Sequence, residues 1–239
     1  MDDSLRVSVV IPVYNGERYL ADAILSALRQ TRPPFEVVVA DDGSTDRSAE
    51  IAQSFGPAVR YDYRPHRPSG GAAAARNRGA ELAGGDLLAF LDADDLWLPE
   101  KLQRQVEAIQ VDLAGAMVFG YVRQFISPEL EEGERAAIEC PADPAPGLTP
   151  CTLLVSRSTF LGTGGFDLSW GVGEFVDWYL RAVERGLQTV MLSDVVALRR
   201  LHRTNQGVLK RDLRLDYVRI VKAARDRRRN APTQGHKDE

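Results

Sequence analysis

Residues 87–95 read Leu-Leu-Ala-Phe-Leu-Asp-Ala-Asp-Asp, an apolar run of strand length that ends abruptly in carboxylates. Burying an unpaired charge costs on the order of several kcal/mol, so Asp92, Asp94 and Asp95 must lie where this strand leaves the core. Carboxylate oxygens at such an exit can hold a hard divalent cation such as Mg²⁺. The structural alternative is an acidic turn that caps the helix expected to begin near Glu100.

Buried strands alternate with helical patterns on the N-terminal side of this run. The patterns predict strands at 7–13, 35–40 and 59–63 and helices at 17–29, 46–55 and 72–83. Strict alternation of this kind predicts an α/β fold with a doubly wound, Rossmann-like and mainly parallel sheet. Ligands of such sheets bind beyond the carboxyl ends of the strands. Polar residues follow three of these ends, at 14–15, 41–42 and 92–95, so we expect them to share one cleft.

The second part of the chain is less regular. A helix is expected at 100–110, strands at 116–122 and 152–155, and a Pro- and Glu-rich loop between them at 127–150. The segment 170–185 and the tail 208–229 have helical spacing.

Composition is that of an ordinary globular protein, with 44% hydrophobic and 27% charged residues among 239. No apolar run approaches the ~20 residues of a membrane span, and the acidic N-terminus does not resemble a signal peptide. The two cysteines, Cys140 and Cys151, suit a reducing compartment, and no zinc spacing is present. We therefore expect a cytoplasmic protein, with no nucleic-acid partner.

Charge is spread unevenly along the chain. The net charge is −4, yet residues 199–229 hold 12 Lys and Arg against three Asp, a local balance of +9. A basic tail of this kind indicates contact with something anionic. The alternatives are the inner face of a membrane, bound peripherally, an acidic acceptor, and the protein's own acidic face.

Five short motifs together resemble one enzyme family. They are Val-Ile-Pro-Val-Tyr-Asn at 10–15, Asp-Asp-Gly-Ser-Thr-Asp at 41–46, Ala-Arg-Asn-Arg-Gly at 75–79, Asp-Ala-Asp-Asp at 92–95 and Gly-Gly-Phe-Asp at 164–167. In this order and spacing, over about residues 7–205, the chain resembles the family 2 glycosyltransferases of the GT-A type. The resemblance implies a GT-A fold with a nucleotide-sugar-binding half at 1–115 and an acceptor-binding, catalytic half at 116–205. Residues 206–239 would form a basic helical C-terminal tail.

The same resemblance implies an activity. It is the metal-dependent transfer of a hexose or N-acetylhexosamine from a nucleotide-diphospho sugar, expected to be a UDP-sugar, to an acceptor hydroxyl. The acceptor could be a saccharide, a peptide or a small molecule. Mn²⁺ or Mg²⁺ would neutralise the leaving diphosphate as a Lewis acid.

Site residues follow from the matching positions. The resemblance implies that the donor is bound by Pro12, Tyr14, Asn15, Asp42, Arg76, Asp92, Ala93 and Asp94, and the metal by Asp94, Asp95 and His202. Asp42 would hydrogen-bond the base, and Arg76 would face the base or the phosphates. The structural alternatives are a core position for Tyr14 and an exposed loop position for His202, while Asp41 is expected to cap a turn.

The chain departs from the family pattern at one catalytic position. Inverting members place the base second in a Glu-Asp pair at the start of a helix, and here Phe175 occupies that position, which cannot accept a proton. The predicted catalytic residues are therefore Glu174 or Asp177, unless the mechanism does not use this position. Residues 170–174, Trp-Gly-Val-Gly-Glu, are similar to a segment of galactosyl- and N-acetylgalactosaminyltransferases in which the glutamate contacts the donor sugar or positions the acceptor. Stereochemistry thus stays open.

Two other functions compete with glycosyl transfer. A catalytically impaired sugar-nucleotide-binding protein is favoured by Phe175 and opposed by the intact acidic cluster. A sugar nucleotidyltransferase would need a Gly-rich phosphate loop after the first strand, and residues 12–15 do not provide one.

Overall fold

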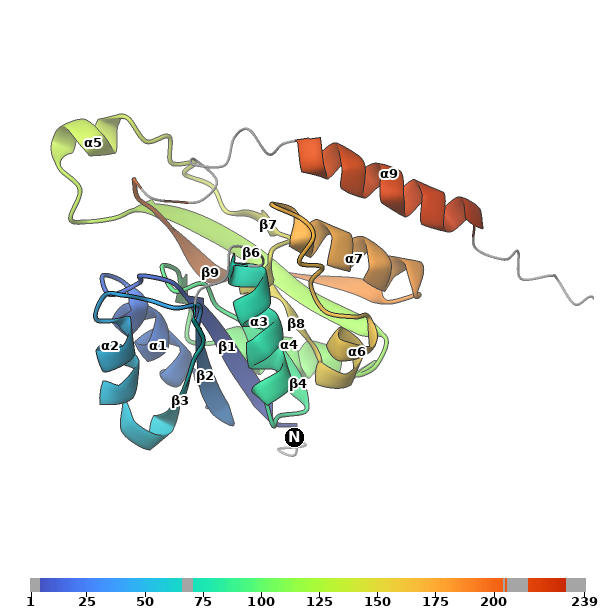
Figure 1. Ribbon diagram of the computed structural model, residues 1–239, viewed down its shortest axis with the longest axis horizontal. Helices are drawn as coiled ribbons and strands as arrows, with labels where there is room; N and C mark the ends of the chain where they lie inside the picture. The colour runs from blue at the N-terminus through green and yellow to red at the C-terminus, as the bar shows by residue number, and fades with distance from the viewer. Residues whose placement is uncertain (1–4, 66–70, 204, 206–214, 231–239) are drawn as a thin grey trace, which may run out of the picture.

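The computed structural model describes residues 5–65, 71–203, 205 and 215–230. In this part of the chain nine strands form one sheet, in the order β3-β2-β1-β4-β8-β6-β9-β5, with β7 paired to β6 (Figure 1). Most of the paired positions along the sheet are parallel. The predicted α/β fold with a mainly parallel sheet is confirmed.

The N-terminal half follows the predicted alternation. Its strands are β1 (Val7–Val13), β2 (Glu36–Asp41), β3 (Val59–Tyr63) and β4 (Leu87–Phe90), all mutually parallel where they pair. Its helices are α1 (Leu20–Leu28), α2 (Ser48–Ser54), α3 (Gly71–Leu82) and α4 (Lys101–Ile109), with a short 3₁₀ turn at Gly56–Ala58. Helix α1 begins three residues later than predicted because Gly16 O accepts hydrogen bonds from Tyr19 N and Leu20 N, which close a turn there.

The second half differs more from the sequence-based expectation. Strand β6 (Ala116–Ile126) extends beyond the predicted residue 122 and pairs in parallel with a long strand, β9 (Gln188–Leu201), that the sequence analysis did not predict. The expected loop at 127–150 contains α5 (Glu132–Ala136) and β7 (Ala145–Gly147). The remaining elements are β5 (Leu96–Trp97), a 3₁₀ turn (Pro150–Thr152), β8 (Leu154–Ser156), α6 (Arg157–Gly162) and α7 (Glu174–Glu184).

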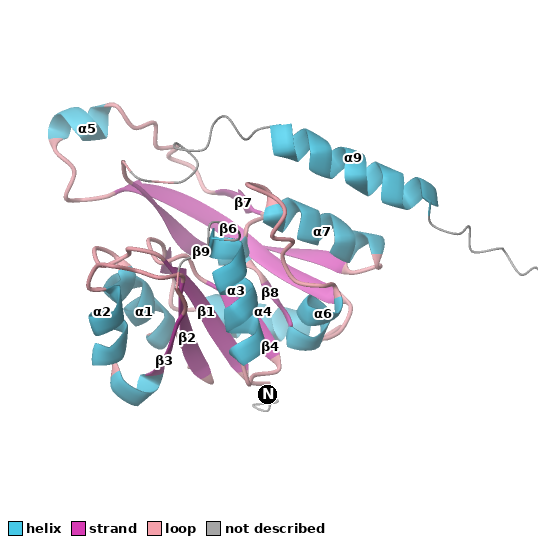
Figure 2. Cartoon of the chain, viewed as in Figure 1, coloured by secondary structure: helices cyan, strands magenta, loops and turns pink. Residues whose placement is uncertain are grey.

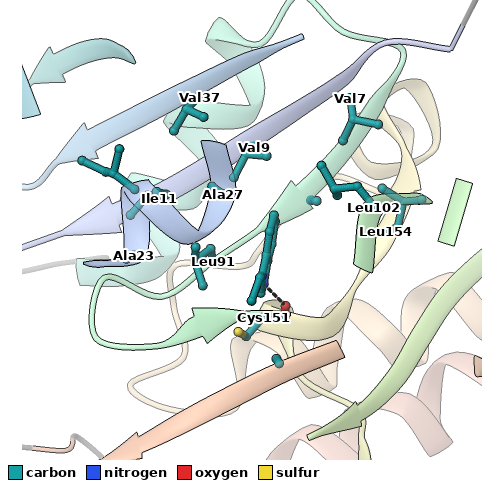
Figure 3. Close-up of a cluster of buried hydrophobic side chains, with 14 of the residues drawn as sticks. Val7, Val9, Ile11, Ala23, Ala27, Val37, Leu91, Leu102, Cys151 and Leu154 are labelled. Atoms are coloured by element: carbon teal, nitrogen blue, oxygen red, sulfur yellow. Dashed lines mark hydrogen bonds between the residues drawn. The ribbon is translucent and has the colours of Figure 1, made fainter. Parts of the chain in front are cut away.

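Helices cover both faces of the sheet (Figure 2). Buried residues of α1, α2 and α4 form one core with β1 and β2, and those of α3, α6 and α7 form a second core on the opposite face. Alternate residues of β1 serve the two sides, since Val9 and Ile11 belong to the first core and Val10 to the second. The Trp97 indole belongs to the first core, part of which Figure 3 shows, and it donates a hydrogen bond of 2.8 Å to the carbonyl of Cys151.

The last described element is α9 (Leu215–Asn230), which packs along α7 (Figure 1). It confirms a helix in the tail, although the predicted start at 208 lies outside the described residues. No helix in the described part of the chain combines the length and the apolar character needed to cross a bilayer. The boundaries proposed at 115 and 205 remain predictions, and the sheet itself is continuous across the first of them.

Candidate functional site

The carboxyl ends of β1, β2 and β4 meet at one edge of the sheet. Asp42 N donates to Val13 O at 2.9 Å, and Leu91 N donates to Val10 O at 3.0 Å, so the three strand exits are joined through backbone hydrogen bonds. The polar residues at 14–15, 41–42 and 92–95 therefore share one edge of the sheet, and the cleft expected between them stays a prediction.

The first exit is a turn held in place by Asn15. This residue adopts a left-handed backbone conformation with φ 51°, which Asn tolerates better than most residues. Asn15 N donates to Ser44 Oγ at 2.9 Å, and Asn15 Oδ1 accepts from Thr45 N at 2.8 Å. Asn15, predicted to bind the donor, thus ties the first exit to the second. Pro12 is buried within β1, one residue before its end.

Tyr14 is exposed, which excludes the alternative that it belongs to the core. Its side chain is 52% accessible at the end of β1. An accessible ring at a strand exit can stack on a flat ligand. This position agrees with the predicted contact to a nucleotide base.

The two aspartates after β2 have different roles. Asp41 is buried, and its Oδ1 accepts from Gly43 N at 2.9 Å and Ser44 N at 2.7 Å, while Oδ2 accepts from the Tyr61 hydroxyl at 2.8 Å. It caps the turn, as predicted. Burial and the hydrogen bond to Asp41 raise the pKa of Tyr61. Asp42 stays partly exposed at the same exit, where the predicted base contact requires it.

Arg76 joins the third exit to the start of α7. Its guanidinium is buried, with Nη2 2.5 Å from Asp92 Oδ1 and Nη1 3.2 Å from Glu174 Oε1. Burial alone would lower the pKa of Arg76, but the charges of the two carboxylates outweigh it and raise the pKa. The structure thus brings together three predicted site residues that lie as far as 98 positions apart in the chain.

Asp94 and His202 form the candidate metal-binding pair. His202 Nε2 lies 2.9 Å from Asp94 Oδ2, and His202 is buried, so the alternative of an exposed loop histidine is wrong. The His202 amide donates to Asn205 Oδ1 at 2.6 Å, which fixes the backbone beyond the end of β9.

Asp95 points to a different environment from Asp94. It is buried, and its Oδ1 accepts from the Arg200 amide at 2.9 Å. Burial first, and then the charges of Asp94 and Asp92, raise its pKa well above the ordinary value. Asp95 was also predicted to ligate the metal, and this stays a prediction; in the structure one of its two carboxylate oxygens accepts from the backbone of β9. Ala93 lies between Asp92 and Asp94, and all three residues are partly buried.

A divalent cation suits this donor set. No group of three His, Cys, Asp or Glu side chains in the described residues is arranged to enclose a metal ion. Mg²⁺ does not need such a cage, because it is usually held by one or two carboxylates, waters and the phosphates of a substrate. Asp94 with His202, beside Asp92, meets that requirement.

Asp177 has both carboxylate oxygens engaged by arginines. It is 2% exposed on α7, with Oδ2 2.7 Å from Arg181 Nε and Oδ1 3.3 Å from Arg227 Nη1. Of the two predicted catalytic carboxylates, only Glu174 is joined to the acidic cluster in the structure. Asp177 instead links α7 to α9.

Phe175 belongs to the second core. It is buried against Phe119, Trp178 and Tyr179, with ring centroids 6.1 to 6.3 Å apart. A carboxylate at this position would require the loss of these contacts, which explains how the departure from the family pattern is accommodated. Gly173, immediately before α7, adopts φ 82°. A Cβ at this position would lie 2.8 Å from Ile220 Cδ1 of α9, which is too close for an unchanged structure.

Two residues near His202 were missed by the sequence analysis. The Tyr19 ring lies 4.9 Å from the His202 ring, and the Tyr19 hydroxyl donates to Glu129. Burial would raise the pKa of Glu129, but hydrogen bonds from Ser127 and Tyr19 outweigh this and lower it to about 2. No local pattern signals a pair separated by 110 positions.

Comparison with known structures supports the fold. S. aureus TarS superposes with a TM-score of 0.72 at 20% identity, over 95% of this chain and 40% of TarS. TarS 1-349 in complex with UDP-GlcNAc superposes with a TM-score of 0.67, over 84% of this chain and 60% of that one. These likenesses establish a fold of the GT-A type.

Sequence relatives are named glycosyltransferases. An uncharacterized glycosyltransferase of Nostoc sp. is 43% identical over 115 residues, which are 47% of this chain and 36% of the relative. The putative teichuronic acid biosynthesis glycosyltransferase TuaG of Bacillus subtilis is 41% identical over 105 residues, which are 42% of this chain and 40% of the relative. The matched part therefore spans well under two thirds of these relatives. The sequence profile of "Glycosyl transferase family 2" matches residues 8–148, more than half of the chain, and the protein belongs to this family.

Proposed function

We propose that the protein transfers a hexose or N-acetylhexosamine from a UDP-sugar to an acceptor hydroxyl. The observation that carries the proposal is the double ion pair of Arg76, which gathers Asp92 and Glu174 at the strand exits where the Asp94–His202 pair also lies. Family membership supports the reaction class. The choice of UDP is supported by TarS, whose fold is shared and whose structures include UDP-GlcNAc and UDP.

The donor would lie across the three exits. Tyr14 and Pro12 would contact the base, Asp42 would hydrogen-bond it, and Asp92 with Ala93 would meet the ribose. Arg76 is charged and buried, and its two carboxylate partners hold it in one orientation. A cation fixed in this way stabilises a nearby diphosphate without reorganisation when charge develops on the leaving group.

Mn²⁺ or Mg²⁺ is the cofactor that we propose, held by Asp94 and His202 and completed by donor phosphates. When bound, the ion would neutralise charge on the departing diphosphate. His202 is held in place from two sides, by the Asn205 side chain at its backbone and by the Tyr19 ring at its imidazole. Such support fixes the orientation of a ligating side chain.

Glu174 is the carboxylate that we assign to the reacting groups. It is partly exposed at the first turn of α7, whereas Asp177 is buried between two arginines and Phe175 has no acidic group. Acting as a general base, Glu174 would take the proton of the acceptor hydroxyl as that oxygen attacks the anomeric carbon. In the other role, Glu174 would bind hydroxyls of the donor sugar. The similarity of residues 170–174 to the Trp-Gly-x-Gly-Glu segment of galactosyl- and N-acetylgalactosaminyltransferases supports this role. NMR of the anomeric configuration of the product separates the two roles, since a base at this position implies inversion.

The experiment that tests the proposal is donor hydrolysis across a panel of UDP- and GDP-sugars, with Mn²⁺ or with EDTA. We expect metal-dependent release of UDP from one donor, abolished by Asp94→Ala. Calorimetry with the same donors tests the second candidate, a sugar-nucleotide-binding protein without activity, which Phe175 favours. Tight metal-dependent binding, without release even when a mixture of saccharide, peptide and small-molecule acceptors is added, would support that candidate. Absence of nucleotide binding would contradict both.

A further inference from the structure

Helix α9 has one face packed on the protein and another that faces solvent. Ile220 and Ala224 are buried on the inner face. Asp216 Oδ2 accepts from Gly171 N at 3.2 Å, and Arg227 Nε lies 2.8 Å from Glu184 Oε2 on α7. These contacts fix which side of the helix is turned outward (Figure 1).

The outer face carries apolar side chains that the fold does not use. Val218 and Val221 are 67% and 60% exposed. Positions 218, 221, 222, 225 and 229 repeat at helical spacing and therefore share one side. Exposed valines on a helix already held by its other side do not contribute to packing of this chain.

Basic residues occupy the same outer face. Lys222, Arg225 and Arg229 are exposed, and none of them has an ion-pair partner within the described residues. Arg219 and Arg227, by contrast, are paired with Asp216 and with Asp177 and Glu184. The helix thus uses some of its arginines to dock and leaves others for an external anion.

We propose that this outer face, defined as Val218, Val221, Lys222, Arg225 and Arg229, binds the surface of an anionic lipid bilayer. Apolar side chains next to Lys and Arg on one face of a helix are typical of helices that lie in the membrane interface. Valine side chains would enter the headgroup boundary while the cations meet lipid phosphates. An acidic protein partner would satisfy the cations but gives no reason for the valines.

Charge complementarity also sets the orientation. The chain as a whole is acidic at −4, whereas helix α9 holds six Lys and Arg against two Asp, a balance of +4. An anionic surface would repel most of this protein and attract it at the C-terminal helix. Because α9 is docked on α7, which begins at Glu174, the proposed contact would also fix the direction of the candidate site relative to the bilayer. The proposal does not depend on the glycosyltransferase activity.

Vesicle cosedimentation of the full chain tests the proposal directly. We expect binding to phosphatidylcholine vesicles containing a third phosphatidylglycerol, little binding to pure phosphatidylcholine, and weakening of the former as salt rises. Lys222→Glu with Arg225→Glu should lower the affinity at least tenfold. Val218→Ser with Val221→Ser should lower it severalfold at every salt concentration and leave the salt dependence unchanged, because the charges that set that dependence stay in place.

The matched control is Arg29→Glu with Arg64→Glu, two exposed arginines far from α9 in sequence that change the net charge by the same amount. It should leave vesicle binding within twofold of the unmodified chain. Circular dichroism and the thermal midpoint of each variant verify folding. Failure to bind anionic vesicles at low salt would overturn the proposal, as would equal loss in the α9 and control variants. Concentration-dependent dimerisation abolished by Val218→Ser with Val221→Ser, without vesicle binding, would assign the face to a second copy of the chain instead.

Discussion

Arg76 Nη1 lies 3.2 Å from Glu174 Oε1, although α3 and α7 are separated by more than ninety positions in the chain. The same guanidinium holds Asp92 at 2.5 Å. Because Arg76 is buried, it fixes both carboxylates rather than tethering them loosely. The first turn of α7 is therefore a part of the strand-exit site, and substitutions there can be used to separate chemistry from stability.

Replacement of Glu174 tests its assignment to the reacting groups. Glu174→Gln keeps the size of the side chain and removes its charge and basicity. We expect kcat to fall by ~10²–10⁴, the usual contribution of a general base, with the Kd for UDP changed by less than about threefold. Glu184→Gln, the same change at the other end of α7, is the control and should retain kcat. Retention of kcat in Glu174→Gln would remove Glu174 from the reaction.

Asp177→Ala is expected to affect stability rather than catalysis. Removing one member of a buried ion pair leaves the partner charges uncompensated, and we expect a loss of about 2–4 kcal/mol in the free energy of unfolding. For a chain of this size that corresponds to a decrease in Tm of roughly 5–15 °C. Arg227→Ala should cost less, because the guanidinium of Arg227 is partly exposed. An unchanged Tm together with loss of turnover would instead assign Asp177 a catalytic role.

Asp94→Ala tests the metal site through binding. Thermal unfolding with UDP, in Mn²⁺ and in EDTA, measures the coupling between the ion and the nucleotide. A ligand at 100 times its Kd stabilises a fold by about 2.7 kcal/mol, so a Mn²⁺-dependent increase in Tm should be readily measurable in the unmodified chain. Asp94→Ala and His202→Ala should remove most of that increment, whereas Asp86→Asn, a change in an exposed carboxylate paired with Arg6, should preserve it. An increment that survives both site substitutions would contradict the assignment of the pair.

The sequence was most informative where local pattern and burial agree. Strands β1, β2 and β4 are largely apolar and buried, since parallel strands covered on both faces need no polar side, and their exits could be read from the polar residues that follow. Asp41 was correctly predicted to cap a turn, because the residues that donate to its carboxylate, Gly43 and Ser44, lie two and three positions later in the chain.

Sequence pattern failed where a residue's role depends on a distant partner. Strand β9 is only partly buried along much of its length and mixes polar with apolar residues, so it lacks the signal of the N-terminal strands. Asp177 has the spacing of a functional carboxylate, but Arg227, fifty positions later, occupies one of its oxygens. Asp95 is buried and accepts from the Arg200 amide, whereas Asp94 is partly exposed beside His202, and both partners lie more than a hundred positions later in the chain.

Lys101 makes a prediction about the pH dependence of stability. Its side chain is 1% exposed, with Nζ 4.1 Å from the centroid of the Trp97 ring and hydrogen-bonded to Gln105. Burial lowers its pKa from 10.5 to about 7. Since the folded pKa lies below the unfolded one, the unfolded chain binds more protons between these values, and the free energy of unfolding rises with pH across that window. This group alone should add about 2 kcal/mol to the free energy of unfolding between pH 7 and 9.

Urea unfolding at pH 7, 8 and 9 should show that slope in the unmodified chain and lose it in Lys101→Met, whose apolar side chain has a similar length. Lys222→Met, at an exposed site, is the control and should keep the slope. Parallel curves for the unmodified chain and Lys101→Met would mean that Lys101 remains protonated in the folded protein, stabilised by the Trp97 ring and Gln105 despite its burial.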